Sequence, residues 1–273
     1  MTLDLKVVGN NFTYRHNGNF GFSTHGKKAK NVRWVDNHNL PTVYIDQQLD
    51  RQLLNPNVNN YGWLLESEAI VPGIYQKVKK NPQMYLNKFK YIFTFDEELL
   101  KYNDRFKFCY ASGPWIQDEN KKIYEKTKLI SCIASHKNKT KGHQLRIKIA
   151  NELKNNLDLY GRIPGGKVLP KKELGLNDYM FSVAIENDLT DSYFTEKILD
   201  CFVTGTIPIY SGCKSIGKFF DERGIIRLDD SFDIKSITKD LYQEKLEYVK
   251  SNFETCIQNY TIMEDDILYK IIS

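Results

Sequence analysis

A cluster of polar and ionisable residues stands between two apolar segments in the second half of the chain. The apolar segments are residues 179–185 and 198–203. The second has the helical spacing of a buried face, and Gly205 ends it, so residues 186–194 form a loop at the carboxyl end of a buried strand. Open α/β sheets bind ligands there. The residues of the cluster are Glu186, Asn187, Tyr193, Thr195, Glu196 and Lys197.

Lys197 is expected in the first turn of this second segment, where the helix macrodipole disfavours a cation. The unpaired backbone N–H groups at the same helix end favour an anion. A bound phosphate would satisfy both, which predicts a phosphate site. The alternative is a lysine whose ammonium extends into water.

A similar strand, loop and helix precede this unit at residues 129–154. Ser135 begins the loop, and Arg146 lies in the first turn of the helix. Leucines and isoleucines spaced by four residues predict a buried stripe that leaves Arg146 outside it, able to clamp a diphosphate with its fork of N–H groups. An ion pair with a neighbouring acid is the alternative. The residues of the stripe are Leu145, Ile149 and Leu153.

A third candidate is the segment 161–167, Gly-Arg-Ile-Pro-Gly-Gly-Lys, which matches all but the last position of the P-loop pattern. Val168 stands where a Ser or Thr would hold magnesium, and Pro170 falls where the following helix should begin. We therefore interpret the segment as a surface loop. A P-loop phosphotransferase is kept as an alternative function.

Short strands and helices alternate along most of the chain, which predicts an α/β fold with parallel strand pairing. Helices are expected at 72–80, 143–154 and 195–204, and the strands between them include 91–95, 129–134 and 206–210. A polar stretch at 117–128 predicts a boundary near residue 118. We expect domains at 1–118 and 119–252, followed by a helix at 253–273 that packs across both.

The composition is that of a globular protein: of 273 residues, 41% are hydrophobic and 27% charged. A net charge of +5 fits a small anionic ligand and is too weak for a nucleic-acid binder. Five scattered cysteines predict neither disulfides nor a zinc site and fit a reducing compartment. No segment is apolar enough to cross a membrane. We expect a soluble cytoplasmic protein.

The spacing of the cluster resembles the signature of the family 10 glycosyltransferases, the α1,3/4-fucosyltransferases. Glu186-Asn187 is followed after five residues by Tyr-Phe-Thr-Glu-Lys at 193–197, and then by Gly-Thr-Ile-Pro-Ile-Tyr at 205–210. The likeness is strongest over 179–220. It implies a GT-B fold, with two Rossmann-like domains facing a cleft, and inverting transfer of a sugar from GDP-fucose to a saccharide acceptor. The short chain suggests a bacterial or viral member.

The resemblance also implies roles for the matched residues. Arg146 and Lys197 hold the donor diphosphate, and Glu196 binds the ribose hydroxyls. Fixed cations stabilise a departing nucleoside diphosphate without a metal, so we expect neither a metal nor a cofactor besides the donor. Tyr210 is equally compatible with a place in the core. The other candidate donor-binding residues are Ser135, Glu186, Asn187, Tyr193, Thr195 and Tyr210.

An inverting transfer needs a base that takes the proton of the acceptor hydroxyl. Glu66 matches the base position of the family, and Glu68 lies two residues further on. We prefer Glu66, although either acid could instead stabilise the start of the next helix. Asp188 and Phe194 depart from the family pattern, which leaves open a donor sugar other than fucose. Because a fold does not guarantee a function, a catalytically inactive, glycan-binding relative is kept as another alternative.

Overall fold

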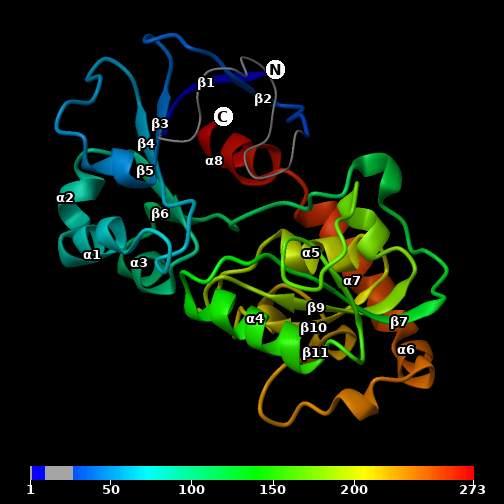
Figure 1. Ribbon diagram of the computed structural model, residues 1–273. Helices are drawn as coiled ribbons and strands as arrows, with labels where there is room; N and C mark the ends of the chain where they lie inside the picture. Colours follow the sequence, from blue (N-terminus) through cyan, green and yellow to red (C-terminus); the bar gives the residue numbers. More distant parts are fainter. Residues whose placement is uncertain (1, 10–26) are drawn as a thin grey trace. The chain divides into compact units, whose positions relative to one another are not determined.

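The computed structural model describes residues 2–9 and 27–273, which divide into two compact units (Figure 1). Unit 1 comprises the chain up to Ser112 together with Ile262–Ser273, and unit 2 comprises Gly113–Thr261. The boundary between the units therefore lies between residues 112 and 113, a few residues before the boundary that the polar stretch predicted near 118. The physical reason lies in Trp115 and Ile116, whose backbone N–H groups donate to the buried Asp200 carboxylate of unit 2 at 2.7 and 3.1 Å.

Among the described residues of unit 1, six parallel strands form one sheet in the order β2-β1-β3-β4-β5-β6. Their short apolar segments pair in register along the sheet, and most of their side chains are buried. The strands are β1 (Leu3–Val8), β2 (Val32–Trp34), β3 (Thr42–Ile45), β4 (Asn60–Trp63), β5 (Tyr91–Thr94) and β6 (Phe106–Phe108).

Helices of unit 1 connect these strands. The helix expected at 72–80 forms with those bounds as α1 (Pro72–Lys80), and its first residue is a proline, whose missing N–H costs nothing at a helix start. The 3₁₀ turn η2 (Asp46–Asp50) follows β3 directly. The other helices are α2 (Pro82–Leu86) and α3 (Glu97–Tyr102).

Unit 2 contains a five-stranded parallel sheet in the order β11-β10-β9-β7-β8. Its central strand β9 is buried over its whole length, as expected for a parallel strand covered on both faces. The strands are β7 (Lys128–Ile133), β8 (Asp158–Tyr160), β9 (Tyr179–Ile185), β10 (Ile207–Ser211) and β11 (Ile226–Arg227).

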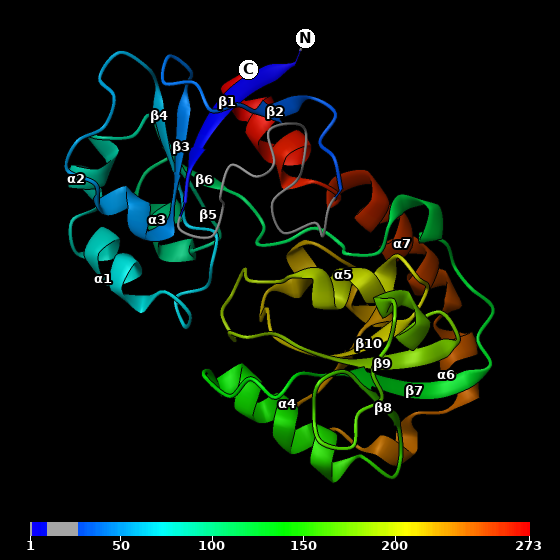
Figure 2. The same cartoon turned by 45° about the horizontal axis from the view of Figure 1, so that its top comes forward.

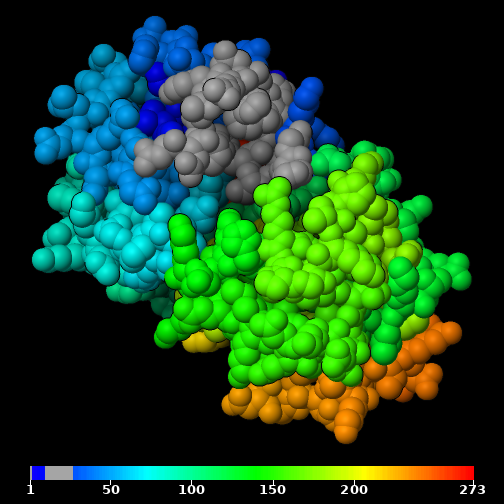
Figure 3. All heavy atoms as spheres, in the orientation of Figure 1, coloured from blue at the N-terminus to red at the C-terminus, as the bar shows by residue number. Residues whose placement is uncertain are grey.

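Helices cover both faces of this sheet, with α4 on one face and α5 on the other (Figure 2). In the space-filling view, α4 and the loop after β8, both drawn in green, form much of the visible surface of unit 2 (Figure 3). The helices are α4 (Lys141–Glu152), α5 (Glu196–Phe202), α6 (Lys239–Glu244) and α7 (Leu246–Asn259). The 3₁₀ turns are η3 (Asp118–Asn120), η4 (Lys172–Gly175), η5 (Ile216–Lys218), η6 (Glu222–Gly224) and η7 (Ile234–Ser236).

The end of the chain differs from the single helix expected at 253–273. α7 ends at Asn259, and a separate helical segment follows as the π-helical η8 (Glu264–Leu268) and α8 (Tyr269–Ile272). This last segment belongs to unit 1, because Asp265 accepts the backbone N–H groups of Lys30 and Asn31 at 2.6 and 2.8 Å. Among the described residues, no helix has the length and apolar character needed to cross a membrane.

Candidate active site

The candidate donor-binding residues gather at the carboxyl ends of β7 and β9. Connections leave these adjacent strands toward opposite edges of the sheet, and open parallel sheets bind ligands at such a switch point. α4 follows β7 and α5 follows β9, so two helices begin at this edge. A Cβ atom on Gly142, in the first turn of α4, would lie 1.9 Å from the Glu186 carbonyl oxygen. Glycine therefore lets α4 begin directly against the loop after β9.

Glu186 organises the start of α5. Its fully buried carboxylate accepts the backbone N–H of Thr195 at 2.9 Å and the hydroxyl of Thr195 at 2.6 Å. Thr195 in turn caps α5 by accepting the backbone N–H of Lys197. The Lys197 ammonium donates to the Thr195 hydroxyl at 2.9 Å and lies 3.4 Å from the Glu186 carboxylate. One buried acid thus fixes both the helix start and the lysine.

Glu196 stays ionised although it is only 9% exposed. Burial alone would raise the pKa of its carboxyl group, but the charges of Lys197 and Lys172 and hydrogen bonds from Lys197 and Thr195 lower that pKa to about 2. The Lys197 ammonium lies 3.0 Å from this carboxylate. Glu196 is therefore a hydrogen-bond acceptor at neutral pH, as a residue that binds hydroxyls requires.

Arg146 lies on the buried face of α4, so the prediction that it lies outside the buried stripe is wrong. Its guanidinium donates to the carbonyl oxygen of Ile185 and, at 3.1 Å, to Oδ1 of Asn187. These two acceptors, which hydrophobicity patterns cannot register, draw the side chain inward. Within residues 27–273 it forms no ion pair with a carboxylate. The buried residues of α4 are Gly142, His143, Arg146 and Ala150.

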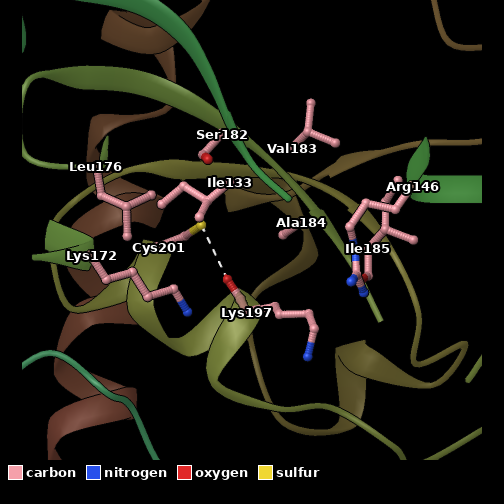
Figure 4. A pocket seen from close by; sticks show the side chains of 10 residues that line it. All are labelled: Ile133, Arg146, Lys172, Leu176, Ser182, Val183, Ala184, Ile185, Lys197 and Cys201. Atoms are coloured by element: carbon pink, nitrogen blue, oxygen red, sulfur yellow. Dashed lines mark hydrogen bonds between the residues drawn. The ribbon is translucent and has the colours of Figure 1, made fainter. Parts of the chain in front are cut away.

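Three cations line one pocket at this edge of the sheet (Figure 4). Arg146 reaches it from α4, Lys197 from α5 and Lys172 from η4. The Lys172 ammonium lies 2.6 Å from Asp200 and 4.8 Å from the centre of the Trp115 ring. The sequence analysis missed Lys172, which lies in an irregular segment with no periodicity to mark it. The pocket therefore has one more cationic side chain than predicted, and that side chain is paired with Asp200.

The remaining candidates lie around this centre rather than in it. Tyr210 is 1% exposed, and its hydroxyl accepts the backbone N–H of Cys213 at 3.0 Å, so it occupies the core. Tyr193 is also buried, and Ser135 lies half-buried directly after β7. The structure therefore joins Arg146 and Asn187 by a hydrogen bond, whereas Tyr210 is a core residue.

Phe194 points into the core of unit 2. Its ring lies 4.9, 5.7 and 5.4 Å from the rings of Phe219, Phe220 and Tyr260. Phe194, which departs from the family pattern, is thus part of an aromatic cluster. Asp188 is half-buried, and its carboxylate accepts the backbone N–H of Leu189 at 2.9 Å.

The segment that resembles a P-loop does not open a helix. Its ends pair with each other, because Gly161 N–H donates to the Lys167 carbonyl and Lys167 N–H donates to the Leu159 carbonyl, both at 2.9 Å. Gly161 has a φ of 96°, which favours glycine. The next helical element is the short turn η4. The helix N-terminus on which phosphate binding by a P-loop depends is therefore missing from this part of the described chain.

In unit 1, the two candidate bases follow β4. Glu66 is exposed, and its backbone carbonyl accepts the hydroxyl of Tyr75 at 3.0 Å. Glu68 lies 2.8 Å from the ammonium of Lys79, which lies equally close to Asp96. Glu68 is thus held in a salt bridge, whereas the Glu66 side chain is exposed.

A third acid of unit 1 was missed by the sequence analysis. Asp46 follows β3, is 8% exposed and has a left-handed φ of 49°. Its carboxylate accepts the backbone N–H groups of Leu65 and Glu66 at 2.9 and 3.2 Å. Burial raises the pKa of Asp46 to about 7, and the Glu66 charge adds to the increase. Asp46 therefore fixes the turn that presents Glu66, a contact between distant segments that no local pattern reveals.

A family model described as glycosyltransferase family 10 (fucosyltransferase), C-terminal, matches residues 123–260, half of the chain. The chain belongs to glycosyltransferase family 10. An α-(1,3)-fucosyltransferase, FucT, of Helicobacter pylori is 33% identical over 86 residues, which are 32% of this chain and 16% of the H. pylori protein. The sequence likeness to this relative therefore spans a small part of its length.

Solved structures of α1,3-fucosyltransferases resemble the fold of this chain. A crystal structure of an α1,3-fucosyltransferase matches with a TM-score of 0.55 and 18% identity, over 97% of this chain and 92% of that one. A crystal structure of α1,3-fucosyltransferase with GDP-fucose matches with a TM-score of 0.52 and 16% identity, over 96% and 92% of the two chains. The two parallel-sheet units are thus those of the GT-B fold expected for the family.

Proposed function

We propose that this family 10 member transfers L-fucose from GDP-fucose to a hydroxyl group of a saccharide, with inversion at the anomeric carbon. The observation that carries the proposal is the convergence of Arg146 and Lys197 on one pocket at the switch point of unit 2. The relative with GDP-fucose bound supports the choice of donor. The H. pylori relative, an α-(1,3)-fucosyltransferase, also supports fucose as the donor sugar.

In this proposal, Arg146 and Lys197 bind the donor diphosphate and stabilise the negative charge that it gains on departure. Lys197 has two acid neighbours, Glu186 and Glu196, so diphosphate oxygens would share its ammonium with them. Glu196 accepts the ribose hydroxyls. Asn187 orients the Arg146 guanidinium through the hydrogen bond at 3.1 Å.

The reaction forms a bond between the acceptor oxygen and the anomeric carbon while the bond from that carbon to the diphosphate oxygen breaks. The electron pair of the broken bond leaves with GDP. The acceptor proton goes to Glu66, and a β-linked donor gives an α-linked product. A correctly placed base contributes typically about 10²- to 10⁴-fold in rate.

The proposal predicts separate effects for donor binding and turnover. Purified protein is incubated with GDP-fucose and a panel of neutral saccharides, and GDP release and product linkage are followed by NMR. Glu66→Gln should bind GDP-fucose with unchanged affinity and lose about 10²- to 10⁴-fold in kcat, because it cannot take the proton. The matched variant Glu68→Gln should keep its kcat within about three-fold.

Three outcomes would contradict parts of this account. Equal loss in both variants would assign the base to another group. A β-linked product would exclude inversion. Tight binding of GDP-fucose without hydrolysis or transfer to any saccharide would instead support a catalytically inactive, glycan-binding relative.

We also propose that the protein works in the cytoplasm. All five cysteines lie in the described part of the chain, where each is buried and none forms a disulfide. Cysteines without disulfides fit a reducing compartment, because disulfides form and persist chiefly in oxidising ones.

A further inference from the structure

His143 has no role in the account so far, although it follows Gly142, where α4 begins directly against the loop after β9. It belongs to the first turn of α4 and is only 3% exposed. Its ring nitrogen Nδ1 is buried and has no hydrogen-bond partner among the described residues. Buried polar atoms without a partner are rare, because each costs the free energy of its lost hydration. A ligand atom at this position would supply the missing partner.

The surroundings of His143 select the charge of that ligand atom. Its backbone N–H is already bonded to Thr140, which caps α4, so the ring is the group left to act. Cations act on the ring from three segments: Arg146 on α4, Lys137 on the preceding loop and Lys197 on α5. Asn187 acts in the opposite direction and raises the pKa of the ring. Three cations and a helix N-terminus favour an anion.

The known ion pairs leave this positive charge partly unbalanced. Lys197 is paired with Glu186 and Glu196, whereas Arg146 bonds to an uncharged carbonyl and an amide oxygen within residues 27–273. Lys137 is exposed on the loop. The anion that fits this position is the diphosphate that Arg146 and Lys197 are proposed to bind.

We propose that His143 is a further donor-binding residue, whose Nδ1 bonds to an oxygen of the donor diphosphate. This inference rests on the proposed function. It assigns to the first turn of α4 a contact that acts together with Arg146 one helical turn further on.

The same surroundings predict how binding depends on pH. Burial and the three cations lower the pKa of His143 to about 4, so the free protein holds a neutral imidazole at pH 7. A bound diphosphate opposes those cations and raises the pKa of the imidazole in the complex. As the pH falls toward the pKa of His143 in the complex, binding takes up a proton. The affinity for the donor therefore increases from pH 8 toward pH 5.5. GDP-fucose is the suitable probe, because its diphosphate does not titrate in this range.

The test compares the wild type, His143→Phe, His143→Gln and the control Gln144→Ala, an exposed residue in the same helical turn. Calorimetry measures the affinity for GDP and GDP-fucose, and saturation-transfer NMR measures the affinity for guanosine. His143→Phe should weaken GDP about ten-fold, as expected for one lost bond to a charged oxygen, and leave guanosine unchanged. His143→Gln should recover most of the GDP affinity and show no pH dependence. Gln144→Ala should match the wild type.

The outcomes separate this inference from the proposed function. Equal weakening of GDP and guanosine by His143→Phe would show a structural role and overturn the inference. Unchanged GDP affinity in His143→Phe would overturn it as well, while wild-type binding of GDP would leave the proposed function standing. Failure of the wild type to bind any guanosine nucleotide would contradict both.

Discussion

Single buried acids set the chemistry of both units. In unit 2, Glu186 bonds to Thr195 with both carboxylate oxygens and so holds the start of α5, from which Lys197 projects. In unit 1, the Asp46 carboxylate accepts the backbone N–H groups of Leu65 and Glu66. Each acid supports a functional side chain through another group, so its own contribution is expected mainly in stability.

Asp46 predicts a pH-dependent stability. The pKa of its carboxyl group is 3.8 when unperturbed and about 7 in the fold. Between about pH 4 and pH 7, the Asp46 carboxyl group therefore holds its proton in the folded state and loses it in the unfolded state. The free energy of unfolding consequently falls as the pH rises through this range. Asp46→Asn removes the buried charge and should raise the free energy of unfolding by about 3 kcal/mol at pH 8 relative to the wild type.

This difference should shrink at pH 5, as measured by urea unfolding followed through tryptophan fluorescence. Asp50→Asn is the matched control, because hydrogen bonds from Lys77 and Tyr85 outweigh burial and lower the pKa of Asp50. That variant should be less stable than the wild type at pH 8. A difference between Asp46→Asn and the wild type that is the same at both pH values would refute a raised pKa at Asp46.

At the scale of elements, apolar periodicity predicts most of unit 2. The expected helices and strands appear within a few residues as α4, α5, β7, β9 and β10. Periodicity fails where polar contacts between distant segments decide, as for Arg146, drawn inward by the Ile185 carbonyl. The sequence analysis also missed His143 and Lys172, the latter because it lies in an irregular segment. Contacts of Asp265 with Lys30 and Asn31 likewise set the end of the chain apart from α7.

The loop that carries the candidate site is anchored by the aromatic cluster around Phe194. Phe194 is fully buried and directly precedes Thr195, the cap of α5. Phe194→Ala should lower the free energy of unfolding by about 3–5 kcal/mol, because it leaves a cavity beside Phe219 and Phe220. Chemical denaturation measures the loss, and Phe194→Leu should lose less. A loss below about 1 kcal/mol in Phe194→Ala would mean that the cluster does not anchor the loop.

At the scale of the whole molecule, the chain returns to unit 1 for its last residues. Asp266 accepts the hydroxyl of Tyr110 at 2.7 Å, and Met263 and Leu268 are fully buried. Deletion of residues 262–273 should therefore damage unit 1 and abolish turnover. GDP affinity should stay within about three-fold of the wild type, because the candidate donor residues all belong to unit 2.

Tryptophan fluorescence can report this damage, because Trp34 and Trp63 are buried in unit 1. Their emission should shift to longer wavelength in the shortened chain as they become exposed to water. If GDP binding is lost together with this shift, the prediction that unit 2 binds GDP without an intact unit 1 is wrong.

The central claim is that unit 2 binds a guanosine diphosphate through fixed cations. The most direct test is calorimetric titration with GDP, UDP and ADP, first in EDTA and then with magnesium. The account predicts that GDP binds most tightly, that EDTA leaves its affinity unchanged, and that Lys197→Ala weakens it at least about ten-fold through loss of a charged contact. Binding of ADP alone and only with magnesium, or full GDP affinity in Lys197→Ala, would contradict it.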